Sequence, residues 1–171
     1  MQKNIQAGFS LIELLVVVAI IGILAAVGTV GYGNYVTQTK IKVTKSNVDS
    51  ISAALGTAEG LAQSTIDTTC TGWATCVWNG TVAGSAIGLT SFKNSYNTLQ
   101  TGATAAAGAG AIRFVATGTI PTCAGPGTNG IIYITTPVSI APDMQVAVSG
   151  CDGTNSTSVY TLNTTWSGPA T

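Results

Sequence analysis

The sequence predicts an α+β fold, in which one long N-terminal helix packs on a four-stranded antiparallel sheet. Three features lead to this prediction: an apolar run over residues 8–28, an amphipathic helical pattern that continues to about residue 62, and four short β-type segments after residue 110. They divide the 171 residues into a polar leader over 1–8, a helix over 9–62 and a globular head over 63–171.

The apolar run is long enough to cross a membrane as a helix. Residues 14–27 carry no charge, and with residues 9–12 the apolar span reaches about 20 residues, roughly what ~30 Å of hydrocarbon requires. Glu13 is the one carboxylate within it, and a carboxylate at that depth is costly enough to indicate a functional residue with a partner. A secretory signal cut near residues 25–26 or a plain membrane anchor would explain the apolar run but not Glu13.

The second part of the helix is amphipathic. Apolar residues recur there at steps of three, four and seven, which predicts a face that docks on another element: Ile41, Val48, Ile51, Leu55, Ala58 and Ala62. A coiled coil is the alternative, but the pattern lasts for too few heptads to support it.

The motif Gly8–Phe9–Ser10–Leu11–Ile12–Glu13 follows the leader MQKNIQAG and precedes the apolar run. This arrangement resembles the processing site of type IV pilins and related pseudopilins. The resemblance implies that a prepilin peptidase cuts between Gly8 and Phe9 and methylates the new N-terminus. It also implies that Glu13 of one subunit pairs with the Phe9 amine of its neighbour in a filament. Ser10 and Glu13 also fit a capping box, a role that is compatible with assembly.

Three glycines, Gly28, Gly31 and Gly33, follow the apolar run. Each costs roughly 1 kcal/mol of helix preference relative to alanine, so this is where the helix is expected to loosen. Val30 stands where the commonest class of type IV pilins carries a proline, so glycine would cause in this chain the local unwinding that the family shows in filaments. The alternative is that the glycines allow close helix packing.

The head is predicted to combine a loop region with a sheet. Residues 63–109 are interpreted as loop, with an Asn-Gly hairpin signal at 77–82, an undecided segment at 87–99 and a flexible connector at 101–110. The four predicted strands cover residues 112–116, 131–135, 144–148 and 158–162.

Four cysteines indicate two disulfides formed in an oxidising compartment, and the sequence leaves all three connectivities open. The resemblance to pilins implies that Cys123 pairs with Cys151 in the C-terminal region, which leaves Cys70 for Cys76. By the positive-inside rule, the lysines at 40, 42 and 45 argue that the part of the chain after the apolar run faces the cytoplasm. The cysteines argue the opposite, because disulfides need an oxidising compartment. We therefore place the head outside.

Composition argues against catalysis. Histidine is absent, charged residues make up only 7% of the chain and its formal net charge is zero, so we expect no enzyme, no cofactor and no specific nucleic-acid partner. Asp152–Gly153 indicates a turn rather than a calcium loop, and we expect no metal site. Asn79, Asn155 and Asn163 begin N-glycosylation triplets, but chance matches are common in a chain so rich in threonine and asparagine.

The resemblance implies a structural subunit, the major pilin, of a bacterial type IV pilus that serves adhesion, twitching motility or DNA uptake. The implied partners are further copies of the chain in a helical filament, the prepilin peptidase and an inner-membrane assembly platform. The subunit would wait in the inner membrane before joining a surface pilus. The alternatives are a type II secretion pseudopilin or minor pilin, and a membrane-anchored binding domain that does not polymerise.

Overall fold

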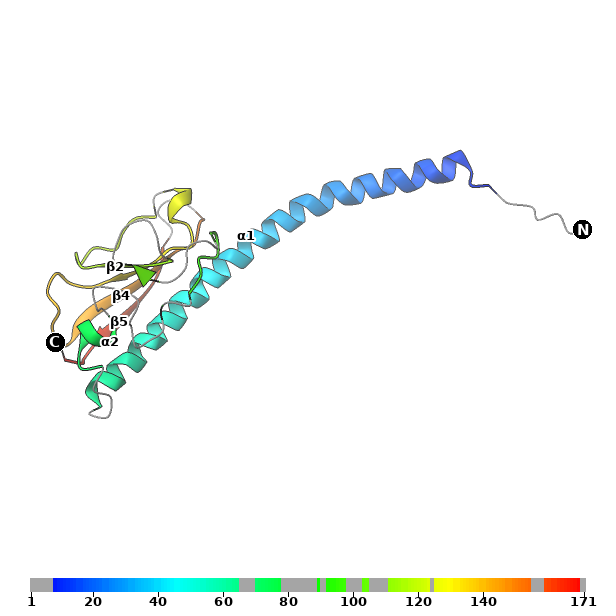
Figure 1. The fold of residues 1–171 in the computed structure, drawn as a ribbon. Coiled ribbons are helices and arrows are strands. Elements are labelled where there is room, and N and C mark those ends of the chain that lie inside the picture. Colours follow the sequence, from blue (N-terminus) through cyan, green and yellow to red (C-terminus); the bar gives the residue numbers. More distant parts are fainter. Residues whose placement is uncertain are drawn as a thin grey trace, which may run out of the picture. The chain divides into compact units, whose positions relative to one another are not determined.

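The computed structural model describes residues 8–64, 70–77, 89, 92–97, 103–104, 111–123, 125–154 and 159–169. The chain divides into two compact units, residues 1–38 and 39–171. Helix α1 (Leu11–Gln63) contributes its N-terminal part to the first unit and its C-terminal part to the second (Figure 1). The predicted long helix is therefore confirmed, within two residues at its start and one at its end.

In the first unit, α1 begins directly after Ser10, whose carbonyl oxygen accepts hydrogen bonds from the amides of Glu13 at 3.1 Å and Leu14 at 3.3 Å. The helix remains regular through Gly28, Gly31 and Gly33. The glycines therefore do not break it in the single chain, and loosening within a filament stays a prediction.

In the second unit, α1 buries one face against the sheet, and the predicted apolar stripe forms most of it. The buried residues of α1 are Ile41, Thr44, Val48, Ile51, Leu55 and Ala58. Thr44 fills the gap in the predicted stripe between residues 41 and 48. Its hydroxyl bonds the Lys40 carbonyl oxygen at 3.0 Å and the Ser95 hydroxyl at 2.9 Å, which satisfies a polar group at a buried position.

The head contains one five-stranded sheet in the order β1-β2-β3-β4-β5. The strands are β1 (Ala103–Thr104), β2 (Ile112–Val115), β3 (Ile132–Thr135), β4 (Met144–Cys151) and β5 (Val159–Trp166). Four of them match the predicted strands, and β4 and β5 are longer than predicted because they pair over eight residues, from Met144 opposite Trp166 to Cys151 opposite Val159.

The prediction of a purely antiparallel sheet is wrong. β3 and β5 are antiparallel to β4, but β2 runs parallel to β3, with Ile112 opposite Ile132 and Val115 opposite Thr135. Parallel neighbours require a connection of about a dozen residues or more, and residues 116–131 provide it. The short β1, which also pairs in parallel with β2, lies in the segment predicted as a flexible connector.

The core of the head lies between α1 and the facing side of the sheet, as the ribbon shows (Figure 1). α1 approaches β4 most closely at Gly150, where an added Cβ would stand 2.7 Å from Cγ2 of Val48 and 2.9 Å from Cγ2 of Thr44. Only a residue without a side chain fits between the helix and the strand at this point.

Two disulfides close the loop regions of the head. Cys70 and Cys76 have Cα atoms 4.7 Å apart; Cys70 precedes the short helix α2 (Trp73–Cys76), and Cys76 is its last residue. Cys123 and Cys151, with Cα atoms 5.5 Å apart, join the connection between β2 and β3 to the end of β4. This second disulfide belongs to a small cluster with Ile131 and Tyr133, separate from the main core.

The last described residues of the head lie against α2. Trp73 and Trp166 pack edge to face, with ring centroids 5.2 Å apart. The Pro169 carbonyl oxygen accepts hydrogen bonds from the Trp73 amide at 3.3 Å and the Trp166 indole at 3.0 Å. The predicted Asn-Gly hairpin lies largely outside the described residues, and of the undecided segment at 87–99 the structure describes Leu89 and residues 92–97.

Candidate functional site: the exposed N-terminal helix

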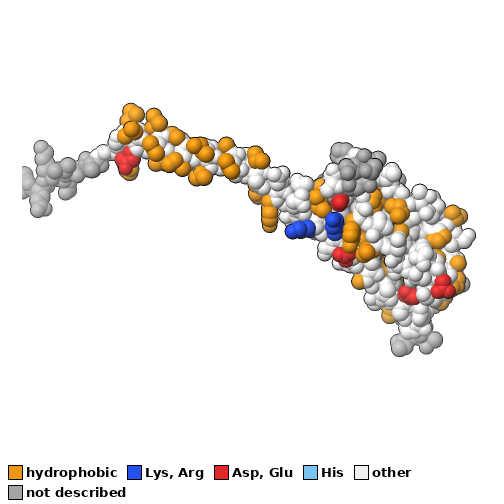
Figure 2. Space-filling model, turned by 180° about the vertical axis from the view of Figure 1, so that it is seen from behind, with side chains coloured by type: hydrophobic (Ala, Val, Ile, Leu, Met, Phe, Trp, Pro, Cys, Tyr) orange, Lys and Arg blue, Asp and Glu red, His pale blue; other side chains and the backbone are white. Residues whose placement is uncertain are grey.

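The N-terminal part of α1 presents apolar side chains to its surroundings on all sides. Its most apolar 18-residue window has no buried residue and a mean hydropathy of 2.8, so this helix is long and apolar enough to cross a membrane. Figure 2 shows hydrophobic side chains along its visible face. Exposed apolar surface on this scale marks a membrane or protein interface. The large exposed residues of this region are Phe9, Leu11, Ile12, Leu14, Leu15, Val16, Val17, Val18, Ile20, Ile21, Ile23, Leu24, Val27, Val30, Tyr32 and Tyr35.

The candidate assembly residues lie together at the start of this helix. Phe9 is 85% exposed and precedes α1, while Glu13 lies in its first turn and is also exposed. A carboxylate is stabilised at this position because the first turn carries the positive end of the helix dipole. Among the described residues neither the Ser10 hydroxyl nor the Glu13 carboxylate accepts a hydrogen bond from the other residue's backbone amide, so the capping box is not formed here. The Glu13 carboxylate is therefore available to an external partner.

Two tyrosines of the head stack against lysines of α1. The Lys40 ammonium lies 5.2 Å from the ring centroid of Tyr96, and the Lys45 ammonium lies 5.5 Å from that of Tyr160. The Tyr160 hydroxyl donates to Oδ1 of Asp49 at 3.0 Å, and this hydrogen bond raises the pKa of Tyr160. Burial and, secondly, the negative charge of Asp152 raise the pKa of Tyr96.

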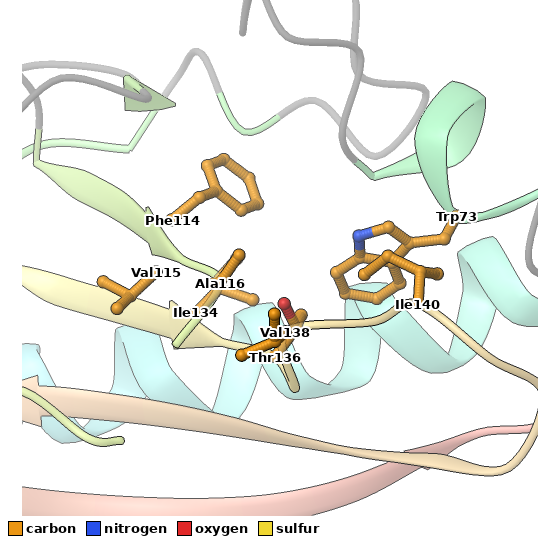
Figure 3. Close-up of a pocket in the computed structure, with 8 residues that line it drawn as sticks. All are labelled: Trp73, Phe114, Val115, Ala116, Ile134, Thr136, Val138 and Ile140. Carbon is orange, nitrogen blue, oxygen red and sulfur yellow. The ribbon is translucent and has the colours of Figure 1, made fainter. Parts of the chain in front are cut away.

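The head also contains a small apolar pocket of about 120 Å³ between α2 and the ends of β2 and β3 (Figure 3). It is lined by Trp73, Phe114, Val115, Ala116, Ile134, Thr136, Val138 and Ile140. None of these side chains can act as a general acid or base, and small-molecule sites usually measure about 300–1,000 Å³. Within the part of the chain that the structure describes, no three His, Cys, Asp or Glu side chains gather as metal ligands.

The comparisons with known proteins concern the same N-terminal segment. Residues 3–29 match the model of the prokaryotic N-terminal methylation motif. The type IV major fimbrial protein FimA of Dichelobacter nodosus is 44% identical over 55 residues, which is 32% of this chain and 35% of that protein. The fimbrial protein EcpC of Eikenella corrodens is 51% identical over 41 residues, 24% of this chain and 27% of that protein.

A fimbrial protein of Moraxella nonliquefaciens is 39% identical over 54 residues, 32% of this chain and 35% of that protein. The matches thus cover about a third of the length of these curated relatives. No solved structure matches the chain significantly.

An exposed apolar helix that continues into an α+β head defines a protein with a membrane or filament stem. The methylation motif and the fimbrial relatives, which match the N-terminal third of the chain, then support a type IV pilin with a class III signal. The sequence correctly predicted the apolar helix, which has Glu13 in its first turn and Phe9 just before its start. It did not predict that Tyr96 and Tyr160 stack on lysines, because these contacts depend on tertiary folding.

Proposed function

We propose that this chain is the major structural subunit of a bacterial type IV pilus and polymerises through the N-terminal part of α1. One observation carries the proposal: an apolar helix, exposed all round, bears a single carboxylate in its first turn, directly after the Gly8–Phe9 pair. The fimbrial relatives, which share this segment, support a structural rather than an enzymatic role.

In this proposal a prepilin peptidase removes residues 1–8 and methylates the amine of Phe9. Cleavage leaves a positive charge four residues before Glu13, at one end of a helix that is otherwise uncharged up to Lys40. The Phe9 amine of one subunit and the Glu13 carboxylate of the next then neutralise one another when both leave water. Their main effect is on axial register, because a buried ion pair adds little net stability while a missing partner leaves a costly unpaired charge.

The cohesion of the filament comes from the apolar side chains. Burial contributes about 25 cal/mol per Å² of apolar surface, and the side chains from Leu14 to Val30 offer such surface in every direction. Contacts of this kind are non-directional, so they do not by themselves define how far one helix slides along another. The pair of the Phe9 amine and the Glu13 carboxylate defines this axial position.

Replacing Glu13 by glutamine tests this role. We expect Glu13→Gln to be cleaved and methylated normally but to form no filaments, because the Phe9 amine would be buried without its counter-ion. Asp143→Asn is the matched control: it removes one carboxylate from the head, and asparagine tolerates the positive φ of 58° at that position. Electron microscopy and the yield of sheared filaments measure assembly. Normal filaments from Glu13→Gln would contradict the proposed pairing.

The subunit recovered from sheared filaments distinguishes the candidate functions. N-methylated Phe9 in the dominant filament protein supports a major pilin. The same terminus confined to the membrane fraction would favour a type II secretion pseudopilin or minor pilin. A chain that begins at Met1, or that is cut near residue 26, would favour a membrane-anchored binding domain.

The proposed path starts in the inner membrane, with the head outside the cytoplasm, and ends in a pilus on the cell surface. An inner-membrane assembly platform would extract the subunit and add it to the growing filament. Adhesion, twitching motility and DNA uptake are the proposed tasks. Surface adherence, colony spreading and transformation frequency of a strain that lacks this chain measure the three separately.

A further inference from the structure

Basic residues of the chain gather around the start of the head. The sequence has six Lys and Arg residues, and three of them lie in one six-residue stretch of α1: Lys40, Lys42 and Lys45. The backbone of Lys93 lies beside the same helix, because the Asn47 side chain donates to the Lys93 carbonyl oxygen at 3.5 Å. We call these four residues the lysine cluster, and Figure 2 shows basic side chains on this part of the molecule.

The segment that carries Lys93 is fixed to the helix. The Ser95 hydroxyl lies 2.9 Å from the Thr44 hydroxyl and donates to the Lys40 carbonyl oxygen at 3.3 Å. The Asn94 amide donates to the Asn129 carbonyl oxygen at 2.9 Å, which ties the same segment to the sheet side of the head. The lysine cluster therefore lies on a surface that hydrogen bonds hold in place. Its members come from α1 and from the segment around Lys93.

No ion pair holds the positive charge of this surface within the described part of the head. None of the four lysines forms an ion pair with a described carboxylate. Lys42 and Lys93 are exposed, and the ammonium groups of Lys40 and Lys45 lie over tyrosine rings, a contact that leaves N–H donors for an anion. Two described acids lie near the cluster. Asp49, one helical turn after Lys45, accepts the Tyr160 hydroxyl, and Asp152 is close enough to Tyr96 to raise its pKa.

Lys40 and Lys42 of the lysine cluster also follow the apolar segment at the distance that a bilayer surface requires. Between Glu13 and Lys40 the sequence holds no charged residue. If the Glu13 carboxylate stays at one interface, about 20 residues cross the hydrocarbon and end near Gly33, and the headgroup layer beyond adds roughly 5–7 Å. At ~1.5 Å per residue, Lys40 lies about 10 Å and Lys42 about 14 Å beyond Gly33. Lysine stems on a helix point back toward its N-terminus and extend along apolar surface, which brings the ammonium groups of these two residues to the edge of that layer.

We propose that the lysine cluster binds the headgroups of anionic phospholipids and thereby holds the head of the unassembled subunit on the outer surface of the inner membrane. Phosphate oxygens accept hydrogen bonds from the ammonium groups and supply the missing negative charge. The inference rests on the proposed membrane-embedded state of the subunit and does not require a filament. It also accounts for basic residues on the side of the membrane where the positive-inside rule disfavours them.

The test uses the full chain reconstituted into phosphatidylcholine bilayers that contain a minority of phosphatidylglycerol. Spin-labelled versions of the two lipids report, by electron spin resonance, which lipid is immobilised at the protein surface. Each lysine near an anionic surface contributes an attraction equivalent to about fivefold in binding, so we expect phosphatidylglycerol to be preferred by roughly fivefold or more. The preference should fall as salt is raised, because exposed charges are screened.

Matched single variants locate the effect. Lys42→Gln removes one exposed charge from the lysine cluster without touching either tyrosine contact, and it should lower the preference severalfold. Lys42→Arg should restore it. Arg113→Gln also removes one positive charge, but from β2, and should leave the preference unchanged.

The outcomes separate this inference from the proposed function. Immobilised lipid without a preference for phosphatidylglycerol would overturn the inference alone. An equal loss in Lys42→Gln and Arg113→Gln would also overturn it, because the attraction would then reflect net charge. If neither lipid were immobilised, the helix would not lie in the bilayer, and both the inference and the proposed membrane-embedded state would fail.

Discussion

Replacing Gly150 by alanine tests the close contact between α1 and the sheet. The added Cβ would lie 2.7 Å from Cγ2 of Val48 and 2.9 Å from Cγ2 of Thr44, whereas carbon atoms in contact prefer about 3.5–4.0 Å. The helix and β4 would have to separate by roughly 1 Å, or the two side chains would have to rotate away.

Rotation is restricted for both neighbours. Val48 is fully buried, and a valine on a helix has one strongly preferred rotamer. Thr44 could turn its methyl group only by giving up the hydrogen bonds of its hydroxyl. We therefore expect Gly150→Ala to lower the free energy of unfolding by about 1–3 kcal/mol, the usual cost of overpacking a core.

The assay is urea unfolding of the full chain in mild detergent, followed by tryptophan fluorescence, since Trp73 and Trp166 are buried in the head. Gly56→Ala is the matched control: it adds the same methyl group on the exposed side of α1, where nothing lies within 4 Å. It should raise the free energy of unfolding by about 1 kcal/mol through helix propensity.

The double variant Gly150→Ala/Val48→Ala decides the cause. Truncating Val48 removes the closest atom, so the loss in the double variant should be clearly smaller than the sum of the two single losses. Strict additivity would refute a steric clash at this point. Unchanged stability of Gly150→Ala alone would show that the helix and the sheet do not approach as closely as described.

Three further predictions concern the disulfide, a tyrosine and the glycines. Replacing Cys123 and Cys151 by serine should lower the free energy of unfolding by about 3–4 kcal/mol in urea titrations, because the bridge closes a loop with a sequence separation of 28. Because burial and Asp152 raise the pKa of Tyr96 in the folded state, its contribution to stability is present below pH of about 10 and is lost as the pH rises through the raised value. As the pH is raised above about 10, the free energy of unfolding should therefore fall less in Tyr96→Phe than in the parent chain, as measured by urea titration at each pH. An identical pH dependence of the two chains would exclude a contribution from Tyr96. Replacing all three glycines within residues 28–33 by alanine should slow the amide hydrogen exchange of this segment in filaments, relative to the parent chain. Equal exchange in the variant and the parent would favour a role of the glycines in close helix packing.

Sequence patterns predicted the helix well because apolar spacing and packing agree along α1. The stripe from Ile41 to Ala58 was visible as a repeat of three and four residues, and the structure buries it. The burial of Thr44 was not predicted, because its side chain is polar. In the folded head its hydroxyl is satisfied by the Lys40 carbonyl oxygen and the Ser95 hydroxyl.

The direction of β2 could not be predicted from the pattern of its side chains. A short apolar segment such as β2 has the same composition whether its neighbour is parallel or antiparallel. The signal that could have corrected the prediction was the length of the connection over residues 116–131, which permits a return to the same end of the sheet. Likewise, the motif around Phe9 and Glu13 was local and could be predicted, whereas Lys93 joins the lysine cluster only through the fold.

The contact at Gly150 also has a consequence for the order in which the head forms. The helical face that carries Val48 and Leu55 is synthesised about a hundred residues before β4, which covers it, and at about 5–20 residues per second this interval lasts roughly 5–20 s. During that time an apolar face has no sheet to pack against, and Cys123 has no partner until Cys151 follows. Any factor that shields this face of the nascent chain would therefore have to act on α1 within those seconds, before the last two strands are synthesised.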